Sequence, residues 1–267
     1  MEDGRNSAVL LILLNELVHS DDEKPTRRKT REWIKMRDHI GYFSCIIKEL
    51  KIEDRFGFRE MFRMDVGDFD FLLNEIYNLI SPGQMSNCGG HRPTMAEEKL
   101  ALTLRFLATG ESFQSLHFLF RISLNAVSYI IKGCCRALVD KLVPKFLQLP
   151  SSEKEWLEIS ETRCNYPYAL DAIDVKHITV KKPANCGSYY YNHKHTQSII
   201  LLAIAGPEYE CLYADVGSDG RVNDSGVWNN SSLLQTIQDR AVKLPKDDDL
   251  FSGVSLPYVF VGDDGFH

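Results

Sequence analysis

The sequence predicts an α+β protein, because helical periodicity fills its first 160 residues and strand-like patterns fill the rest. In the first region, apolar residues recur at the spacing of a buried helix face, as at Phe69, Leu72, Leu73, Ile76, Leu79 and Ile80. Short apolar runs of strand length begin near residue 168, at 168–175, 198–205 and 209–216. We therefore expect a helical region over residues 1–160 and a strand-rich domain over residues 161–267.

The composition is that of a globular protein, with 44% apolar and 25% charged residues. The formal net charge of −6 excludes a protein that coats nucleic acid through an overall basic surface. Residues 161–267 hold 9 basic and 14 acidic residues, whereas residues 1–160 hold 22 and 23. An acidic second half suits metal binding, and DNA contact would have to use local basic patches.

One such patch is the early cluster of basic residues between Lys24 and Arg37. It is either a solvated arm or a nuclear-targeting or DNA-contacting segment. The apolar run from Val9 to Leu14 is too short to span a membrane, so we expect no membrane partner. Seven cysteines without a Cys-x-x-Cys pair indicate reduced thiols, and hence a nuclear or cytoplasmic protein.

The helical region carries recognisable start and stop residues. Asp65 is placed to cap the helix that ends before Ser81. Thr94 and Glu97 have the spacing of a capping box, which predicts a helix running to Gly110. Leu100, Leu104 and Leu107 would share its buried face.

Residues 112–142 have the pattern of a helix-turn-helix. A short helix over 112–120 is followed by a tight turn and by a longer helix that Ser123 can cap. The second helix would expose Asn125, Tyr129 and Lys132, which are side chains that suit a DNA groove. An ordinary helical hairpin has the same spacing and is the more common outcome. Pro144 and Pro150 then predict a linker before a short helix through Trp156 and Leu157.

Two aspartates follow apolar strands in the second half. Asp174 ends the run 169–173, and Asp263 follows the run 258–261; a helix over 224–244 separates the strands. Functional groups collect at the carboxyl ends of strands, and two neighbouring carboxylates can bind a pair of Mg²⁺ ions for phosphodiester cleavage. Taken singly, each aspartate is more simply explained as a turn former.

Several ordered sequence words resemble one family. They are Ala-Ile-Asp-Val-Lys-His (172–177), Gly-Ser-Tyr-Tyr-Tyr-Asn-His-Lys (187–194), Asp-Val-Gly-Ser-Asp-Gly-Arg (215–221), Asn-Asp-Ser-Gly-Val-Trp (223–228) and Tyr-Val-Phe-Val-Gly-Asp (258–263). Together with Leu-Arg-Phe-Leu-Ala-Thr-Gly (104–110) and Phe-Arg-Ile-Ser (120–123), they resemble the PIF/Harbinger transposase-derived nucleases of the DDE superfamily. The resemblance runs from about Arg31 to the end of the chain.

The resemblance implies an RNase H-like α/β domain with a mixed sheet and a metal-binding triad of two aspartates and a glutamate. Asp174 matches the first acid and Asp263 the second, while Asp224 matches a supporting aspartate that is a helix cap near the site. The family's third acid lies downstream of Asp263, and this chain stops at His267, so it resembles a C-terminally truncated member with an incomplete nuclease domain.

The implied function is a nuclear hydrolase that cleaves DNA with Mg²⁺ or Mn²⁺, aided by a separate DNA-binding helper protein. Three departures weaken the expectation of full activity: Val175 and His195 replace family glycines, and Asp171 replaces a small residue. With two aspartates alone we expect weak metal binding and poor cleavage, which extending the chain to the downstream acid should restore. The alternatives are a domesticated, non-catalytic DNA- or protein-binding module and a helical interaction protein.

The segment between the first two strands offers two further interpretations. His177, Cys186, His193 and His195 do not have the spacing of a structural zinc site. Lysines and tyrosines alternate there with the chemistry of a nucleic-acid contact, at Lys181, Lys182, Tyr189, Tyr190, Tyr191 and Lys194. A strand hairpin with half-buried tyrosines explains the same pattern equally well.

Overall fold

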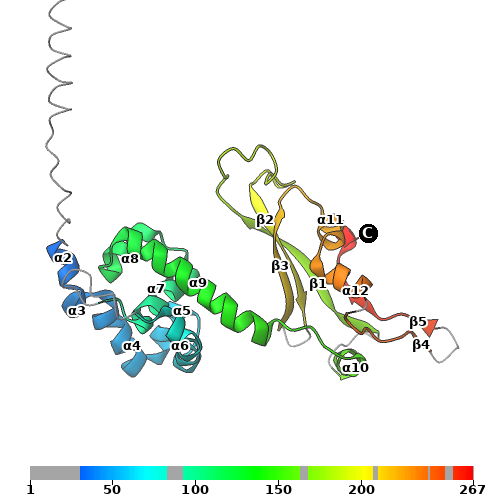
Figure 1. Cartoon of the computed structure of the whole chain (residues 1–267), viewed down its shortest axis with the longest axis horizontal. Coiled ribbons are helices and arrows are strands. Elements are labelled where there is room, and N and C mark those ends of the chain that lie inside the picture. The colour runs from blue at the N-terminus through cyan, green and yellow to red at the C-terminus, as the bar shows by residue number, and fades with distance from the viewer. Residues whose placement is uncertain are drawn as a thin grey trace, which may run out of the picture. The chain divides into compact units, whose positions relative to one another are not determined.

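A computed structural model of the chain describes residues 31–82, 93–162, 168–206, 210–239, 241–249 and 255–266. The apolar run Val9–Leu14 and the basic residues before Arg31 lie outside these ranges. The described residues form two compact units, divided between Cys135 and Arg136 (Figure 1). This division comes before the boundary at 160/161 that the sequence patterns suggest.

The helical region has ten described helical elements before the first strand. In chain order they are α2 (Glu32–Lys35), α3 (Arg37–Ile40), the π-helix η1 (Phe43–Ile47), α4 (Lys48–Glu53), α5 (Arg55–Phe62), α6 (Val66–Ile80), α7 (Ala96–Thr109), α8 (Phe113–Phe120), α9 (Leu124–Phe146) and α10 (Glu153–Thr162). The first unit is centred on aromatic rings of α5 and α6. Phe58, Phe62 and Phe69 lie within 5.8 Å of one another, centroid to centroid, and each is at most 2% exposed.

The start of α7 differs from the expected capping box. The helix begins one residue later, with Met95 at the N-cap position and no side-chain cap. The Oγ1 atom of Thr94 instead accepts a hydrogen bond from Arg37, whose guanidinium also pairs with the buried carboxylate of Glu98 at 3.5 Å. Tertiary contacts therefore replaced local capping. They also make Arg37 a structural residue, with a side chain only 12% exposed.

The predicted pair of helices is present, although the second helix ends at Phe146 and not at residue 142. Helix α8 covers Phe113–Phe120 and α9 begins at Leu124, with a bend of 104° between them. Arg121 supplies the turn with a left-handed φ of 53°. The expected linker at Pro144 is wrong, because α9 continues through it to Phe146. A proline removes one helical N–H, and here the helix ends within the following turn.

The second unit is built on a mixed four-stranded sheet with the order β3-β2-β1-β6. Its strands are β1 (Ala169–Thr179), β2 (Ser198–Ala205), β3 (Cys211–Asp219) and β6 (Val259–Val261). Strand β1 pairs antiparallel with β2 and parallel with β6, and β2 pairs antiparallel with β3. Two-residue strands β4 (Asp248–Asp249) and β5 (Ser255–Leu256) form a separate ladder, and the 3₁₀ helix η2 (Asp264–Phe266) follows β6.

Two short helices cover one face of this sheet. Helices α11 (Asp224–Asn229) and α12 (Ser232–Gln238) supply Val227 and Leu233 to a core that includes Ile173, Ile200 and Leu202. The sequence predicted one helix over 224–244. The helix is broken because the Ser231 hydroxyl accepts a hydrogen bond from Leu234 N–H and starts a new helix.

In the part of the chain that the structure describes, no single helix is long and apolar enough to cross a membrane. Only α8 and α9 taken together reach that length and apolarity, with the sharp bend between them.

Candidate functional site

Asp174 lies in β1, and Asp263 lies just after β6, the parallel strand next to β1. The last β1–β6 pair is Ala172 with Val261, and each aspartate lies two residues beyond it. Gly262 supports the continued register, since a Cβ placed on it would lie 3.1 Å from Cγ2 of Ile173. Residues two apart in a strand share a face, so Asp174 is on the same face as Ala172, whereas Asp263 lies two residues past the end of β6. β1 and β6 are therefore neighbours in the sheet, although β1 continues past Asp174 to Thr179 and Asp263 lies outside β6.

Asp224 lies close to Asp263 at Gly265. A Cβ placed on Gly265 would lie 2.5 Å from Oδ2 of Asp224 and 3.0 Å from Oδ1 of Asp263. The Gly265 N–H donates a hydrogen bond of 3.0 Å to the same Asp263 oxygen. Asp224 is the first residue of α11 and not its cap, because the Asn223 side chain accepts the capping hydrogen bond from Gly226 N–H. A glycine at 265 thus leaves room for the two carboxylates to approach. We call the site formed by Asp224, Asp263 and Gly265 the carboxylate corner.

The donors at this corner are hard carboxylate oxygens, which fit Mg²⁺ or Mn²⁺. Asp174 is exposed, and its Oδ1 accepts a hydrogen bond of 2.7 Å from the N–H of Val175. Across the described ranges, no three acidic, histidine or cysteine side chains are grouped closely enough to hold a metal ion. The structure therefore brings Asp224 and Asp263 together, with Asp174 on the next strand.

Side chains alternate between the two faces of β1. This alternation puts two departures from the family pattern, Asp171 and Val175, on the face opposite Asp174. Asp171, Ile173 and Val175 point to the covered face, whereas Asp174 points to the exposed face. Val175, which replaces a family glycine, packs its side chain on the core and not on the face of Asp174. Asp171 is three residues from Asp174 and therefore on the opposite face of the strand. Asp171 is 2% exposed, and neither of its oxygens has a partner among the described residues.

Burial has a large effect on Asp171. Loss of solvation, and secondarily the negative charge of Glu210, raises the pKa of its carboxyl to about 7. A shifted pKa of this kind can indicate catalysis. Here the residue is on the opposite face of the sheet from Asp174, so we assign it no role in the reaction.

The long connection between β1 and β2 lies beyond the end of the sheet (Figure 1). Lys181, Lys182 and Lys194 are exposed there, as the sequence pattern suggests. Tyr190 is only half-exposed, whereas Tyr189 and Tyr191 are 61% and 44% exposed. The nitrogen Nδ1 of His177 lies 2.9 Å from the hydroxyl of Ser198, and its ring contacts His193. Burial, and then the charge of His193, lower the pKa of His177.

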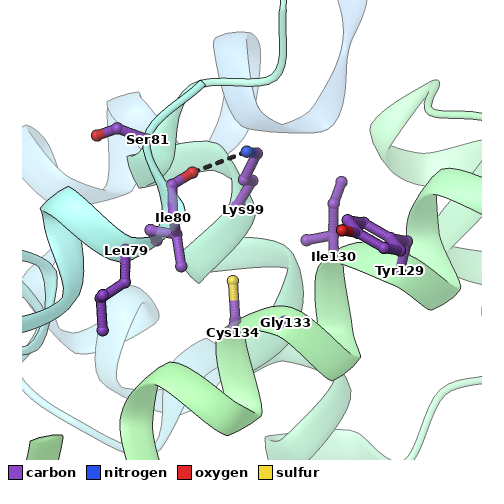
Figure 2. Close-up of a pocket in the computed structure, with 8 residues that line it drawn as sticks. All are labelled: Leu79, Ile80, Ser81, Lys99, Tyr129, Ile130, Gly133 and Cys134. Atoms are coloured by element: carbon purple, nitrogen blue, oxygen red, sulfur yellow. Dashed lines mark hydrogen bonds between the residues drawn. The ribbon is translucent and has the colours of Figure 1, made fainter. Parts of the chain in front are cut away.

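In the helical unit, Asn125, Tyr129 and Lys132 are exposed on α9, and Tyr129 is 82% exposed. Tyr129 also borders a pocket of about 270 Å³ between α6, α7 and α9 (Figure 2). The ammonium group of Lys99 there donates to the carbonyl of Ile80 at 2.7 Å. Burial raises the pKa of the Cys134 thiol in the same pocket. A protonated thiol is a poor nucleophile, so this pocket does not have the chemistry of a covalent catalytic site.

Comparison with known proteins identifies the second unit. Residues 173–267 match the family described as DDE superfamily endonuclease. The chain is also 25% identical over 217 residues to Protein ALP1-like of Arabidopsis thaliana, an alignment that covers 78% of this chain. The chain spans about half (52%) of that relative's length. No solved structure was found to match.

The matched segment begins one residue before Asp174 and includes Asp224 and Asp263. It contains most of β1, the other three strands of the sheet and the corner at Gly265. The resemblance to Harbinger-type nucleases is therefore confirmed: residues 173–267 are a DDE superfamily endonuclease domain.

Proposed function

We propose that this DDE endonuclease domain is a divalent-metal-dependent nuclease of transposase origin that hydrolyses DNA phosphodiester bonds. The observation that supports the proposal is the parallel pairing of β1 with β6, because Asp174 and Asp263 each follow its last pair by two residues. Asp224 joins Asp263 at Gly265 and supports the same corner. The substrate would be nuclear DNA, and the family resemblance adds a separate DNA-binding helper protein as a partner.

In this proposal Asp174 and Asp263 hold the metal ions, and Asp224 orients Asp263 or a bound water. When bound, Mg²⁺ or Mn²⁺ ions supply an activated water and stabilise the leaving oxygen. The strands fix the two carboxylates more firmly than a loop would, and the N–H of Gly265 holds one Asp263 oxygen in place. With two aspartates as the principal ligands, we expect weak metal affinity and slow cleavage.

Plasmid nicking tests the proposal directly. The protein is incubated with supercoiled DNA and Mn²⁺ or Mg²⁺, with and without chelator, beside its Asp174→Ala and Asp263→Ala variants. Asp239→Ala, an exposed aspartate at the end of α12, is the matched control. We expect slow nicking that chelator and both site variants abolish and that the control retains. Nicking that survives chelator, or that neither site variant reduces, would overturn the assignment.

A non-catalytic DNA-binding module is the second candidate, and the geometry of α8 and α9 favours it. The bend of 104° and the three-residue turn are those of a helix-turn-helix. Asn125, Tyr129 and Lys132 are exposed on its second helix. In this candidate, α9 binds duplex DNA and the carboxylate corner performs no reaction.

Charge reversal separates the two candidates. Lys132→Glu should weaken duplex binding several-fold and lower the salt dependence by about one phosphate contact, whereas Lys141→Glu, farther along α9, should not. Unchanged affinity and salt dependence in Lys132→Glu would exclude groove binding by α9. Duplex binding through Lys132 without any metal-dependent nicking would establish the non-catalytic module.

A further inference from the structure

The connection between β1 and β2 concentrates positive charge in an otherwise acidic domain. Residues 175–207 contain four lysines and no aspartate or glutamate, whereas residues 161–267 as a whole have a net charge of −5. Lys181, Lys182 and Lys194 are exposed in this connection. Arg221 is exposed beside it and donates its backbone N–H to the carbonyl of Tyr189 at 3.2 Å. A polyanion would be attracted to this part of the domain.

Two tyrosines stand among these charges with their rings in solvent. Tyr189 is 61% and Tyr191 is 44% exposed. They are two residues apart in one loop, so both exposed rings lie among the basic side chains of the connection. Exposed aromatic rings between basic side chains are the surface on which unpaired nucleic-acid bases stack.

A buried asparagine fixes the backbone of the loop that follows the tyrosines. Asn192 is 4% exposed and accepts hydrogen bonds from the N–H groups of Lys194 and Thr196, both at 3.0 Å. Its amide nitrogen donates to the hydroxyls of Thr196 and Ser198 at 3.0 and 2.9 Å. The backbone of Tyr190 accepts from Ser198 N–H at 2.8 Å. Such a network fixes the loop before a ligand arrives, which lowers the entropy cost of binding.

The same loop is connected to the carboxylate corner. Gly220 packs so closely on the hairpin that a Cβ there would lie 2.4 Å from the Ser198 hydroxyl and 2.6 Å from the Tyr190 carbonyl. Arg221 follows, and Asp224 lies three residues later at the start of α11. Three extended residues span at most about 10 Å, so the tyrosines are within a few nucleotides of the acidic site.

We infer that Tyr189 and Tyr191, with the surrounding lysines and Arg221, form a stacking surface for unpaired bases next to the scissile phosphate. The inference rests on the proposed nuclease function and specifies its substrate: DNA with unpaired nucleotides at or beside the cleavage point. A continuous duplex keeps its bases stacked inside and offers these rings no partner. The lysines would contact the backbone of either form of DNA.

Binding to two matched DNAs tests the inference. One is a blunt duplex, and the other is the same duplex with a single-stranded tail that carries 2-aminopurine. Fluorescence anisotropy gives the affinity, and the 2-aminopurine signal reports stacking. We expect tighter binding of the tailed DNA, and a Tyr189→Ala/Tyr191→Ala variant should bind it about five- to a hundredfold more weakly. Its affinity for the blunt duplex should stay within about twofold of the unmodified protein.

Three controls make the result interpretable. Tyr189→Phe/Tyr191→Phe keeps the rings and should keep the preference for the tail. Tyr77→Ala removes a comparably exposed tyrosine from α6 and should change neither affinity. Lys181→Ala/Lys182→Ala should weaken both DNAs and reduce the salt dependence of each. Circular dichroism of every variant excludes unfolding as the cause.

The outcomes also separate this inference from the proposed function. Equal affinity for the two DNAs, or an alanine variant with an unchanged tail preference, would overturn the stacking surface even if nicking is metal-dependent. A tail preference that depends on the rings, without any nicking, would confirm the surface and reject the nuclease.

Discussion

The two faces of β1 carry aspartates three residues apart in opposite surroundings. Asp171 is 2% exposed on the face covered by α11 and α12, and it has no hydrogen-bond partner among the described residues. Asp174 is exposed on the other face, next to the strand that precedes Asp263. The same chemical group is thus exposed to solvent on one face and buried on the other, where loss of solvation raises its pKa to about 7. Strand alternation alone, an odd spacing of three, produces the difference.

The largest expected effect is on nicking activity, and it tests whether the two faces of β1 differ in function. Asp174→Asn should reduce metal-dependent nicking about a hundredfold or more, because the substituted amide binds Mg²⁺ poorly and the reacting oxygens lose their fixed positions. Asp171→Asn should leave nicking within about twofold. Both variants change one oxygen for nitrogen, so they are matched in size. An equal loss of nicking activity in Asp174→Asn and Asp171→Asn would show that the site is not confined to the exposed face of β1.

The next largest effect concerns how the free energy of unfolding depends on pH. The pKa of Asp171 is raised to about 7 in the folded protein from an ordinary value of 3.8, so the folded state binds a proton that the unfolded state releases. Stability should therefore be greatest below about pH 4 for this group and should fall as the pH rises to about 7. Asp171→Asn lacks this titration and should exceed the unmodified protein by about 2 kcal/mol at pH 8.

Urea unfolding at pH 5, 6, 7 and 8 measures this difference. Asp174→Asn, on the exposed face, is the control and should run parallel to the unmodified protein across the same range. A stability gap between Asp171→Asn and the unmodified protein that does not widen with pH would contradict the assigned burial of Asp171.

A third prediction concerns the corner at which Asp224 and Asp263 meet. Gly265→Ala adds a Cβ only 2.5 Å from one carboxylate and 3.0 Å from the other, so one of them must move. We expect Mn²⁺ affinity, measured by calorimetry, and nicking to fall about tenfold, because metal ligands must keep their spacing. Gly67→Ala in α6 has open space around the new Cβ and should change neither quantity. Unchanged Mn²⁺ binding in Gly265→Ala would separate this corner from the metal site.

Much of this comparison could be predicted from the sequence. The apolar runs before Asp174 and Asp263 predicted two strands, which the structure contains as β1 and β6. The limits of α8 were also predictable, because Ser112 caps it locally and Arg121 ends it. These features depend on a few neighbouring residues, and local patterns describe such features well.

The remaining features depend on distant residues. Thr94 does not cap α7 because Arg37, 57 residues away, takes its hydroxyl. The approach of Asp224 to Asp263 at Gly265 joins a helix start to the end of β6, and no spacing in the sequence indicates it. The hairpin pattern did not distinguish Tyr190 from Tyr189 and Tyr191, because burial there is set by contacts with Gly220 and Ser198.

The smallest predicted effect concerns Lys176, which follows Asp174 by two residues on the exposed face of β1. If this face meets DNA, the ammonium group lies near the phosphates beside the scissile bond and releases about one counterion on binding. Lys176→Gln should then weaken DNA affinity about two- to threefold at moderate salt and lower the salt slope by about one. Lys154→Gln on α10 is the control, because it removes an exposed lysine from a different element. The measurement is anisotropy across a salt series in Ca²⁺, which occupies carboxylate sites without supporting the expected cleavage. An unchanged slope for Lys176→Gln would mean that DNA does not lie along the exposed face, and the scissile phosphate would then have to approach Asp174 from the β1–β2 hairpin.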